Sequence, residues 1–87
     1  MKTITELMPV NGRQSFHGKA KLIQSASGKY LLSYSTIVAG VVDGDIHRYW
    51  SGRSNTTSTH LVSFFSAVGK DMTTAKFYEL PLEHANI

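Results

Sequence analysis

Residues 36–50 read TIVAGVVDGDIHRYW and contain the pattern that decides the fold. The run 36–42 carries β-branched side chains on both alternating faces, which is typical of a strand that is covered on two sides. Asp43-Gly44 follows directly, and this pair is preferred in the type I′ turns that join antiparallel strands. Residues 45–50 then return as the next strand, so the sequence predicts an antiparallel hairpin near the centre of the chain.

The residues before this hairpin predict further strands of the same sheet. Residues 15–23 alternate between apolar or small and basic side chains, and a period of two indicates a half-buried strand. A turn at 25–28 leads to an expected strand over 29–35, in which Tyr30, Leu32 and Tyr34 share one face. Residues 1–10 are ambiguous, since 3–5 fit an edge strand and 5–8 fit a helical turn. We expect a three- to four-stranded antiparallel meander.

The residues after the hairpin predict helices. Apolar side chains recur at helical spacing in the order Leu61, Phe64, Phe65 and Val68. They predict one main amphipathic helix near 57–68, which ends at Gly69, and a short second helix follows over about 73–80. Strands first and helices last indicate a single α+β domain over residues 1–87. We expect the main helix to cover the sheet face that carries Phe16, Leu22, Leu32 and Ile37, with Phe16 and Trp50 as core anchors.

Composition excludes several classes of function. The 87 residues include no cysteine, so disulfides, thiolate metal sites and cysteine nucleophiles are excluded. The four histidines form no HxH or HxxxH pair, and no nucleophile motif is present, so we expect no metal site, no cofactor and no enzyme activity. No apolar run approaches the roughly 18 residues of a membrane span, and the first residues do not resemble a signal peptide. We therefore expect a cytoplasmic protein that does not enter a membrane.

Charge is unevenly distributed along the chain. Residues 11–60 hold six basic and two acidic side chains, a balance of +4, and residues 71–87 hold one basic and three acidic ones, a balance of −2. The first segment is therefore expected to attract anions.

The segment 51–59, SGRSNTTST, leads into the main helix and offers a candidate anion site. A helix N-terminus has unpaired backbone N–H groups that attract negative charge. The residues that gather there are Arg53, Ser54, Thr56, Thr57 and His60, and we expect them to hold a phosphate or carboxylate of the partner. The alternative is plain capping of the helix by Thr56 or Thr57.

A second candidate surface is a basic sheet face. Its expected members are Arg13, Lys19, Lys21 and Arg48, with Tyr34, Tyr49 and Trp50 near them. Basic side chains interleaved with aromatic ones bind single-stranded nucleic acid by phosphate pairing and base stacking. The alternative is an ordinary solvated outer face.

Longer patterns carry a family resemblance. They are NGRQSFHGKA at 11–20, YLLSYSTIVA at 30–39, Trp50-Ser51-Gly52 and TTSTH at 56–60. Together they resemble a family of small domains of unknown function from phages and mobile elements of Firmicutes, over about residues 10–80. His17 departs from the pattern, which has an aromatic residue there. The resemblance implies a phage-type accessory protein that acts by binding in the host bacterial cytoplasm.

The leading functional expectation is a binding protein that inhibits or modulates a host macromolecule. An anti-defence role, such as inhibition of a host nuclease system, is the form that the resemblance implies, and the partner would be a host protein or a protein–nucleic-acid complex. The alternative is direct binding of nucleic acid or a nucleotide through the basic sheet face and the helix N-terminus. Because so short a chain buries little surface, a homodimer through an edge strand or the open sheet face is also expected.

Overall fold

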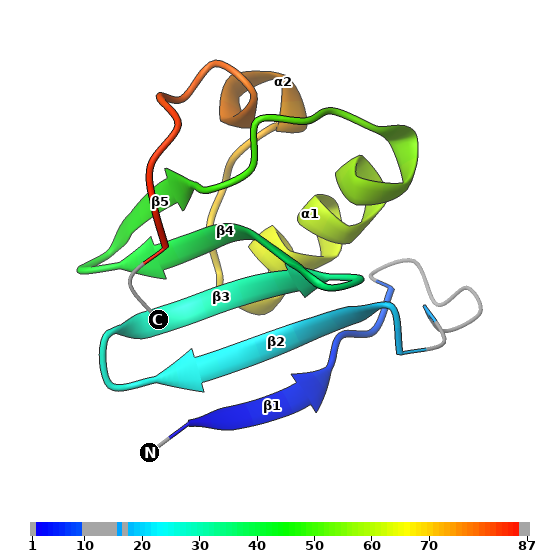
Figure 1. The fold of residues 1–87 in the computed structure, drawn as a ribbon, viewed down its shortest axis with the longest axis vertical. Coiled ribbons are helices and arrows are strands. Elements are labelled where there is room, and N and C mark those ends of the chain that lie inside the picture. Colours follow the sequence, from blue (N-terminus) through cyan, green and yellow to red (C-terminus); the bar gives the residue numbers. More distant parts are fainter. Residues whose placement is uncertain (1, 10–15, 17, 86–87) are drawn as a thin grey trace.

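The computed structural model describes residues 2–9, 16 and 18–85, and it has a five-stranded antiparallel sheet followed by two helices (Figure 1). Each strand pairs with its neighbours in sequence, and the order is β1 (Thr3–Glu6), β2 (Ala20–Ser25), β3 (Gly28–Ser33), β4 (Thr36–Val42) and β5 (Asp45–Arg48). The helices are α1 (Asn55–Ala67) and α2 (Thr74–Phe77). The expected α+β meander is confirmed, with five strands in place of three or four. No helix within the described residues is long and apolar enough to cross a membrane.

The turns explain where the strands begin and end. Asp43 and Gly44 have φ of 54° and 83°, which both central residues of a type I′ turn require, so the predicted hairpin is confirmed. β2 begins at Ala20, later than the predicted start at 15, because Gly18 turns the chain at φ 75°. Of the two interpretations of the first residues, the edge strand is correct, since Thr3–Glu6 pairs with β2.

Local capping sets the bounds of α1. The Ser54 hydroxyl accepts a hydrogen bond from the Thr57 N–H at 3.0 Å, so the helix begins before the predicted position and its cap is neither Thr56 nor Thr57. At the other end Gly69 has φ 71°, and the Lys70 N–H donates to the Phe65 carbonyl at 2.9 Å. These contacts form a Schellman motif, which confirms the predicted helix end. α2 is capped by Thr73 and ends at Phe77, three residues before the predicted end at 80.

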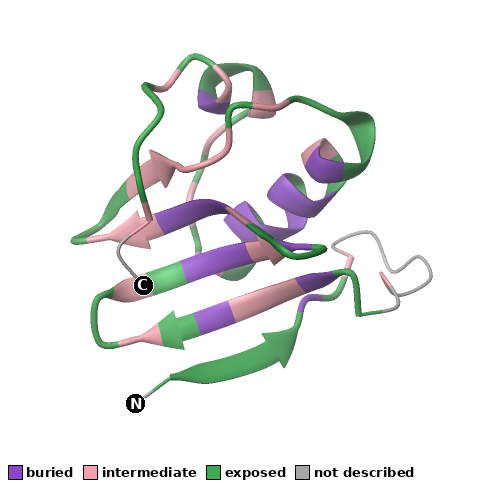
Figure 2. Cartoon of the chain, in the orientation of Figure 1, coloured by how far each residue is buried: buried purple, intermediate pink, exposed green. Residues whose placement is uncertain are grey.

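The core lies between α1 and one face of the sheet. Leu61, Phe64 and Phe65 are buried on α1, and they meet Leu31 and Ala39 of the central strands within one cluster. Val68, Phe16 and Trp50 are partly buried against this cluster. Figure 2 shows that the buried residues follow the sheet-facing side of α1 and the middle of β3 and β4. The helical stripe predicted from the sequence is therefore the centre of the core.

The predicted partner face of α1 was half wrong. Leu22 pairs with Leu31, and both point toward α1. Leu32 pairs with Lys21 on one side and Ile37 on the other, so these side chains lie on the opposite face. The cause is the tight turn between Ser25 and Gly28, which sets the register so that Leu31 rather than Leu32 opposes Leu22.

The opposite face of the sheet is covered only in part. Tyr30 is 1% exposed and packs beside Tyr49 over Gly40, where an added Cβ would lie 2.7 Å from the Tyr30 ring and 2.8 Å from the Tyr49 ring. The C-terminal segment forms a parallel bridge from Leu82 to β5 and then runs past β5 and β4 (Figure 1). In Figure 1 no described helix or loop lies over β1 and β2 on this face, where Ile4 is 54% exposed and Ile23 is 5% exposed.

The core arrangement predicts the effect of Phe64→Ala. Phe64 is 0% exposed, so removal of its ring leaves a cavity and is expected to lower the free energy of unfolding by about 3–5 kcal/mol. Val62 lies on the same helix and is 48% exposed, so Val62→Ala should change it by only about 0.5 kcal/mol. Urea denaturation followed by far-UV circular dichroism measures both, and equal midpoints for the two variants would contradict this core.

Candidate functional site

The structure divides the residues predicted at the start of α1 into two groups. Arg53, Ser54 and Thr56 are exposed, while Thr57 is 5% and His60 only 2% exposed. His60 lies in the second turn of α1 rather than the first, and its ring points toward the sheet, where it meets Ser33. The five side chains therefore do not converge on one surface point. Arg53 instead lies over the Tyr78 ring, with 4.8 Å between its guanidinium carbon and the ring centroid.

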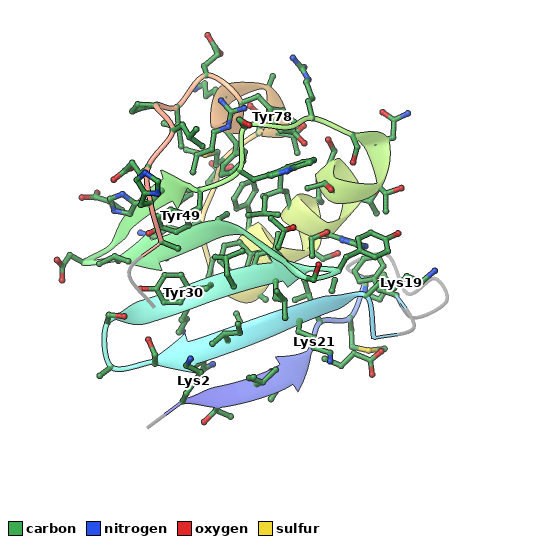
Figure 3. The ribbon with its side chains drawn as sticks, viewed as in Figure 1. Lys2, Lys19, Lys21, Tyr30, Tyr49 and Tyr78 are labelled. Atoms are coloured by element: carbon green, nitrogen blue, oxygen red, sulfur yellow. The ribbon has the colours of Figure 1, made fainter. Side chains whose placement is uncertain are left out.

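The residues of the predicted basic face are also separated. Lys21 lies on the sheet face opposite α1, near the end of β1 (Figure 3), whereas the paired row that contains Arg48 faces α1. Lys19 lies just before β2, beside the turn between β3 and β4. Arg13 falls outside the described residues. The prediction of a single face that holds Lys21 and Arg48 together is therefore wrong.

Arg48 is held by backbone carbonyls. Its Nε donates to the Trp50 carbonyl at 3.0 Å, and its Nη2 donates to the Ser51 carbonyl at 3.1 Å. Its Nη1 donates to the carbonyls of Tyr78 and Leu80, at 2.8 and 3.3 Å. Because carbonyls at a helix end lack intrahelical partners, the guanidinium caps the end of α2. Arg48 therefore joins β5 to α2 and to the segment that leads into α1.

Lys19 and His60, which the sequence assigned to different sites, meet at one corner of the molecule. The His60 Nδ1 and the Ser33 hydroxyl form a hydrogen bond of 2.8 Å, and the Phe16 ring contacts His60 edge-on at a centroid distance of 4.6 Å. Tyr34 lies 5.9 Å from the His60 ring, and the Lys19 ammonium lies 5.9 Å from the Tyr34 ring centroid. We call these five residues the Tyr34 corner.

Tyr34 has an unusual backbone conformation for its residue type. It occupies the two-residue turn between Ser33 and Thr36 with φ 57°, and its side chain is 55% exposed. The predicted placement of Tyr34 in a strand with Tyr30 and Leu32 was therefore wrong. This conformation costs a residue with a Cβ about 1–2 kcal/mol, so glycine or asparagine is usual there. Backbone outliers of this kind cluster at functional sites, which makes the exposed ring a candidate contact.

His60 forms the buried base of this corner. Burial lowers its pKa below the ordinary value near 6.5, and the nearby Lys19 ammonium lowers the pKa further. The imidazole is therefore neutral at neutral pH, and its bond to Ser33 fixes the strand end from which the turn begins. Within residues 2–9, 16 and 18–85, no group of three His, Asp or Glu side chains could hold a metal ion.

The comparisons with known proteins give one match. The sequence model of a family of unknown function, DUF8033, matches residues 5–79, which are 75 of the 87 residues. The chain belongs to DUF8033. The expected resemblance to a family of unknown function is thereby confirmed, while an origin in phages or mobile elements stays a prediction. Neither a curated protein nor a solved structure matches the chain significantly.

The DUF8033 segment contains the Tyr34 corner and both helices. Sequence reasoning placed Tyr34 near Lys19 on the basic sheet face but assigned His60 to the start of the helix, so it did not bring the three residues together. The signal that was available is the polar break SYST at 33–36 between two apolar runs, which indicates a turn. That turn places Tyr34 at a hairpin tip.

The lowered pKa of His60 predicts acid sensitivity. Folded His60 resists protonation more than unfolded His60 does. Its contribution to the free energy of unfolding is therefore fully present above about pH 6.5 and is lost as the pH falls through the lowered pKa of the folded state. Melting temperatures measured from about pH 7 to pH 5 should therefore fall for the parent. His60→Asn should reduce this fall, while His84→Asn, which replaces an exposed histidine, should keep it. A fall of equal size in all three proteins would contradict the assignment to His60.

The contacts of Arg48 predict that lysine cannot replace it. Arg48→Lys keeps the charge but loses the planar fork, and it should lower the free energy of unfolding by about 1.5–3 kcal/mol. Arg53→Lys is the matched control, because Arg53 is exposed and stacks on the same Tyr78 ring. Chemical denaturation compares the two, and a similar loss for both variants would show that the carbonyl contacts of Arg48 contribute little.

Proposed function

We propose that the protein is a non-catalytic binding module and that the Tyr34 corner binds single-stranded nucleic acid. The observation that carries the proposal is an exposed tyrosine ring at φ 57° with a lysine ammonium beside it. A base stacks on such a ring, and an adjacent cation pairs with a phosphate of the same strand. Direct binding of nucleic acid was the alternative function expected from the sequence, there through the basic sheet face and the helix N-terminus.

The surroundings of Tyr34 support this proposal. The buried His60 and its bond to Ser33 hold the turn from below, so the ring is presented with little loss of conformational freedom on binding. Lys21 lies two residues after Lys19, at the start of β2, and adds positive charge there on the opposite sheet face, without contact to Tyr34. Arg53, at the start of the helix that carries His60, offers a second phosphate contact.

A second candidate is the role implied by the resemblance, inhibition of a host macromolecule such as a nuclease system in the bacterial cytoplasm. The observation that favours it is the uncovered part of the sheet face opposite α1, where Ile4 is 54% exposed and Leu32 and Ile37 are partly exposed. Exposed aliphatic side chains beside polar ones are typical of a protein-binding surface. In this proposal the partner is a protein rather than a nucleic acid.

Tyr34→Asn separates binding from folding. Asparagine tolerates φ 57°, so the melting temperature should stay equal or rise, while the loss of one stacked base should weaken binding by about 5- to 100-fold. The measurement is fluorescence anisotropy of a labelled oligothymidylate across a salt series. Tyr34→Phe keeps the ring and should bind like the parent. Lys19→Ala should reduce the slope of the logarithm of the binding constant against the logarithm of the salt concentration by about one. Arg53→Ala tests the second phosphate contact in the same way.

Two results would overturn the nucleic-acid proposal. One is a parent protein that shows no oligonucleotide binding at low salt, and the other is a Tyr34→Asn variant that binds as tightly as the parent. A pull-down from host lysate, with and without nuclease, then tests the second candidate. A host protein that stays bound after nuclease treatment would support the second candidate. If no host protein stays bound after nuclease treatment, the second candidate is contradicted.

A further inference from the structure

β1 is an exposed edge strand. All four residues of Thr3–Glu6 are exposed, and β1 pairs with β2 on one side only. Figure 1 shows β1 at the margin of the sheet, with no helix or described loop along its outer side. Such an edge presents unpaired backbone groups to any strand of matching pattern.

The ladder to β2 determines which backbone groups face outward. The Leu7 N–H donates to the Ala20 carbonyl at 2.9 Å, and hydrogen-bonded pairs alternate along an antiparallel ladder. Thr3 and Thr5 therefore bond to β2, in register with Gln24 and Leu22. The N–H and C=O groups of Lys2, Ile4 and Glu6 point away from the sheet.

The sequence of this edge is complementary to itself. Residues 2–6 read KTITE, with a basic residue at one end, an acidic residue at the other and isoleucine in the middle. We propose that β1 pairs antiparallel with β1 of a second copy of this chain, about a two-fold axis at Ile4. Lys2 then lies opposite Glu6 of the second copy, Ile4 lies opposite Ile4, and Thr3 lies opposite Thr5. Opposite charges, aliphatic pairs and threonine pairs are each favourable across antiparallel strands.

The outward backbone groups select this register. Only Lys2, Ile4 and Glu6 have outward backbone groups, so an antiparallel pair of β1 strands must join these residues to one another. Besides a two-fold axis at Ile4, the axis could then lie at Glu6, or at Thr3 or Thr5 between two outward residues. An axis at Glu6 places two carboxylates opposite each other. An axis at Thr3 or Thr5 places Ile4 opposite Lys2 or Glu6, so the opposite-charge pair between Lys2 and Glu6 does not form. The register at Ile4 pairs all three outward residues with opposite or like-sized partners. Glu6 accepts from the Gly18 N–H through Oε1 at 2.9 Å, so Oε2 remains for Lys2 of the second copy.

The side chains of the joined strands extend the uncovered sheet face. Ile4 lies on the same face as Ile23 and Lys21, and Figure 3 shows Lys2 and Lys21 along opposite ends of β1. Across the axis this face becomes continuous, with the exposed Ile4 of each copy packed against the other. The two five-stranded sheets then form one continuous antiparallel sheet.

Charge swaps test the dimer and its register. Sedimentation equilibrium over a concentration series should show the mass rise from 9.6 kDa toward twice that value, about 19 kDa. Lys2→Glu and Glu6→Lys each place like charges opposite each other and should weaken the dimer about tenfold. An equal mixture of the two variants restores both opposite-charge pairs and should associate like the parent. Lys76→Glu, on α2, makes the same charge change away from β1 and should leave the dimer unchanged.

Ile4→Pro provides a test that does not depend on charge. Proline removes only an N–H that faces outward, so the ladder to β2 and the far-UV spectrum should remain while dimerisation is lost. The proposal is overturned if the parent stays monomeric up to the highest soluble concentration. It is equally overturned if Ile4→Pro still dimerises, or if the mixed charge variants associate no better than each variant alone.

Discussion

The guanidinium of Arg48 joins the sheet to both of the helical segments that follow it. A single side chain on β5 donates to carbonyls of residues 50 and 51, which lead into α1, and of residues 78 and 80, which end α2. The contacts to Trp50, Tyr78 and Leu80 are partly buried, and a buried carbonyl that loses its hydrogen-bond donor is costly. Tyr78 is stacked by Arg48 and Arg53 and shares a hydrogen bond with Ser58, so the same group also fixes the start of α1.

The part of the fold that local chemistry controls could be predicted from the sequence. Asp43-Gly44 defines its turn, and Leu61, Phe64 and Phe65 define the buried face of α1, because turn type and helical periodicity act over a few residues. The faces of Leu32 and Ile37 could not be predicted, since one residue of register exchanges the two faces. The proximity of Lys19, Tyr34 and His60 could not be predicted for a similar reason. It depends on the exact position of the turn between β3 and β4 and on the packing of α1 against β3.

Polar side chains that look available for chemistry in the sequence are used to hold the fold. His60 is bonded to Ser33, Ser54 caps α1, and His47 pairs with Glu83 at 2.8 Å. Tyr34 differs from them, because its backbone conformation is unfavourable for its residue type and its ring remains exposed. A residue that costs stability where asparagine or glycine would not is the kind of exception that function explains better than folding.

The order of the strands has a consequence for how the chain reaches this structure. Each strand pairs with the next one along the sequence, so most contacts form between segments that are separated by a short turn. Low sequence separation between contacting residues favours rapid folding, and the hairpins can assemble one after another. The contact between Arg48 and the carbonyls near α2 spans about thirty residues and closes a much longer loop. We therefore expect the sheet to form early and the α2 end of the molecule to dock last.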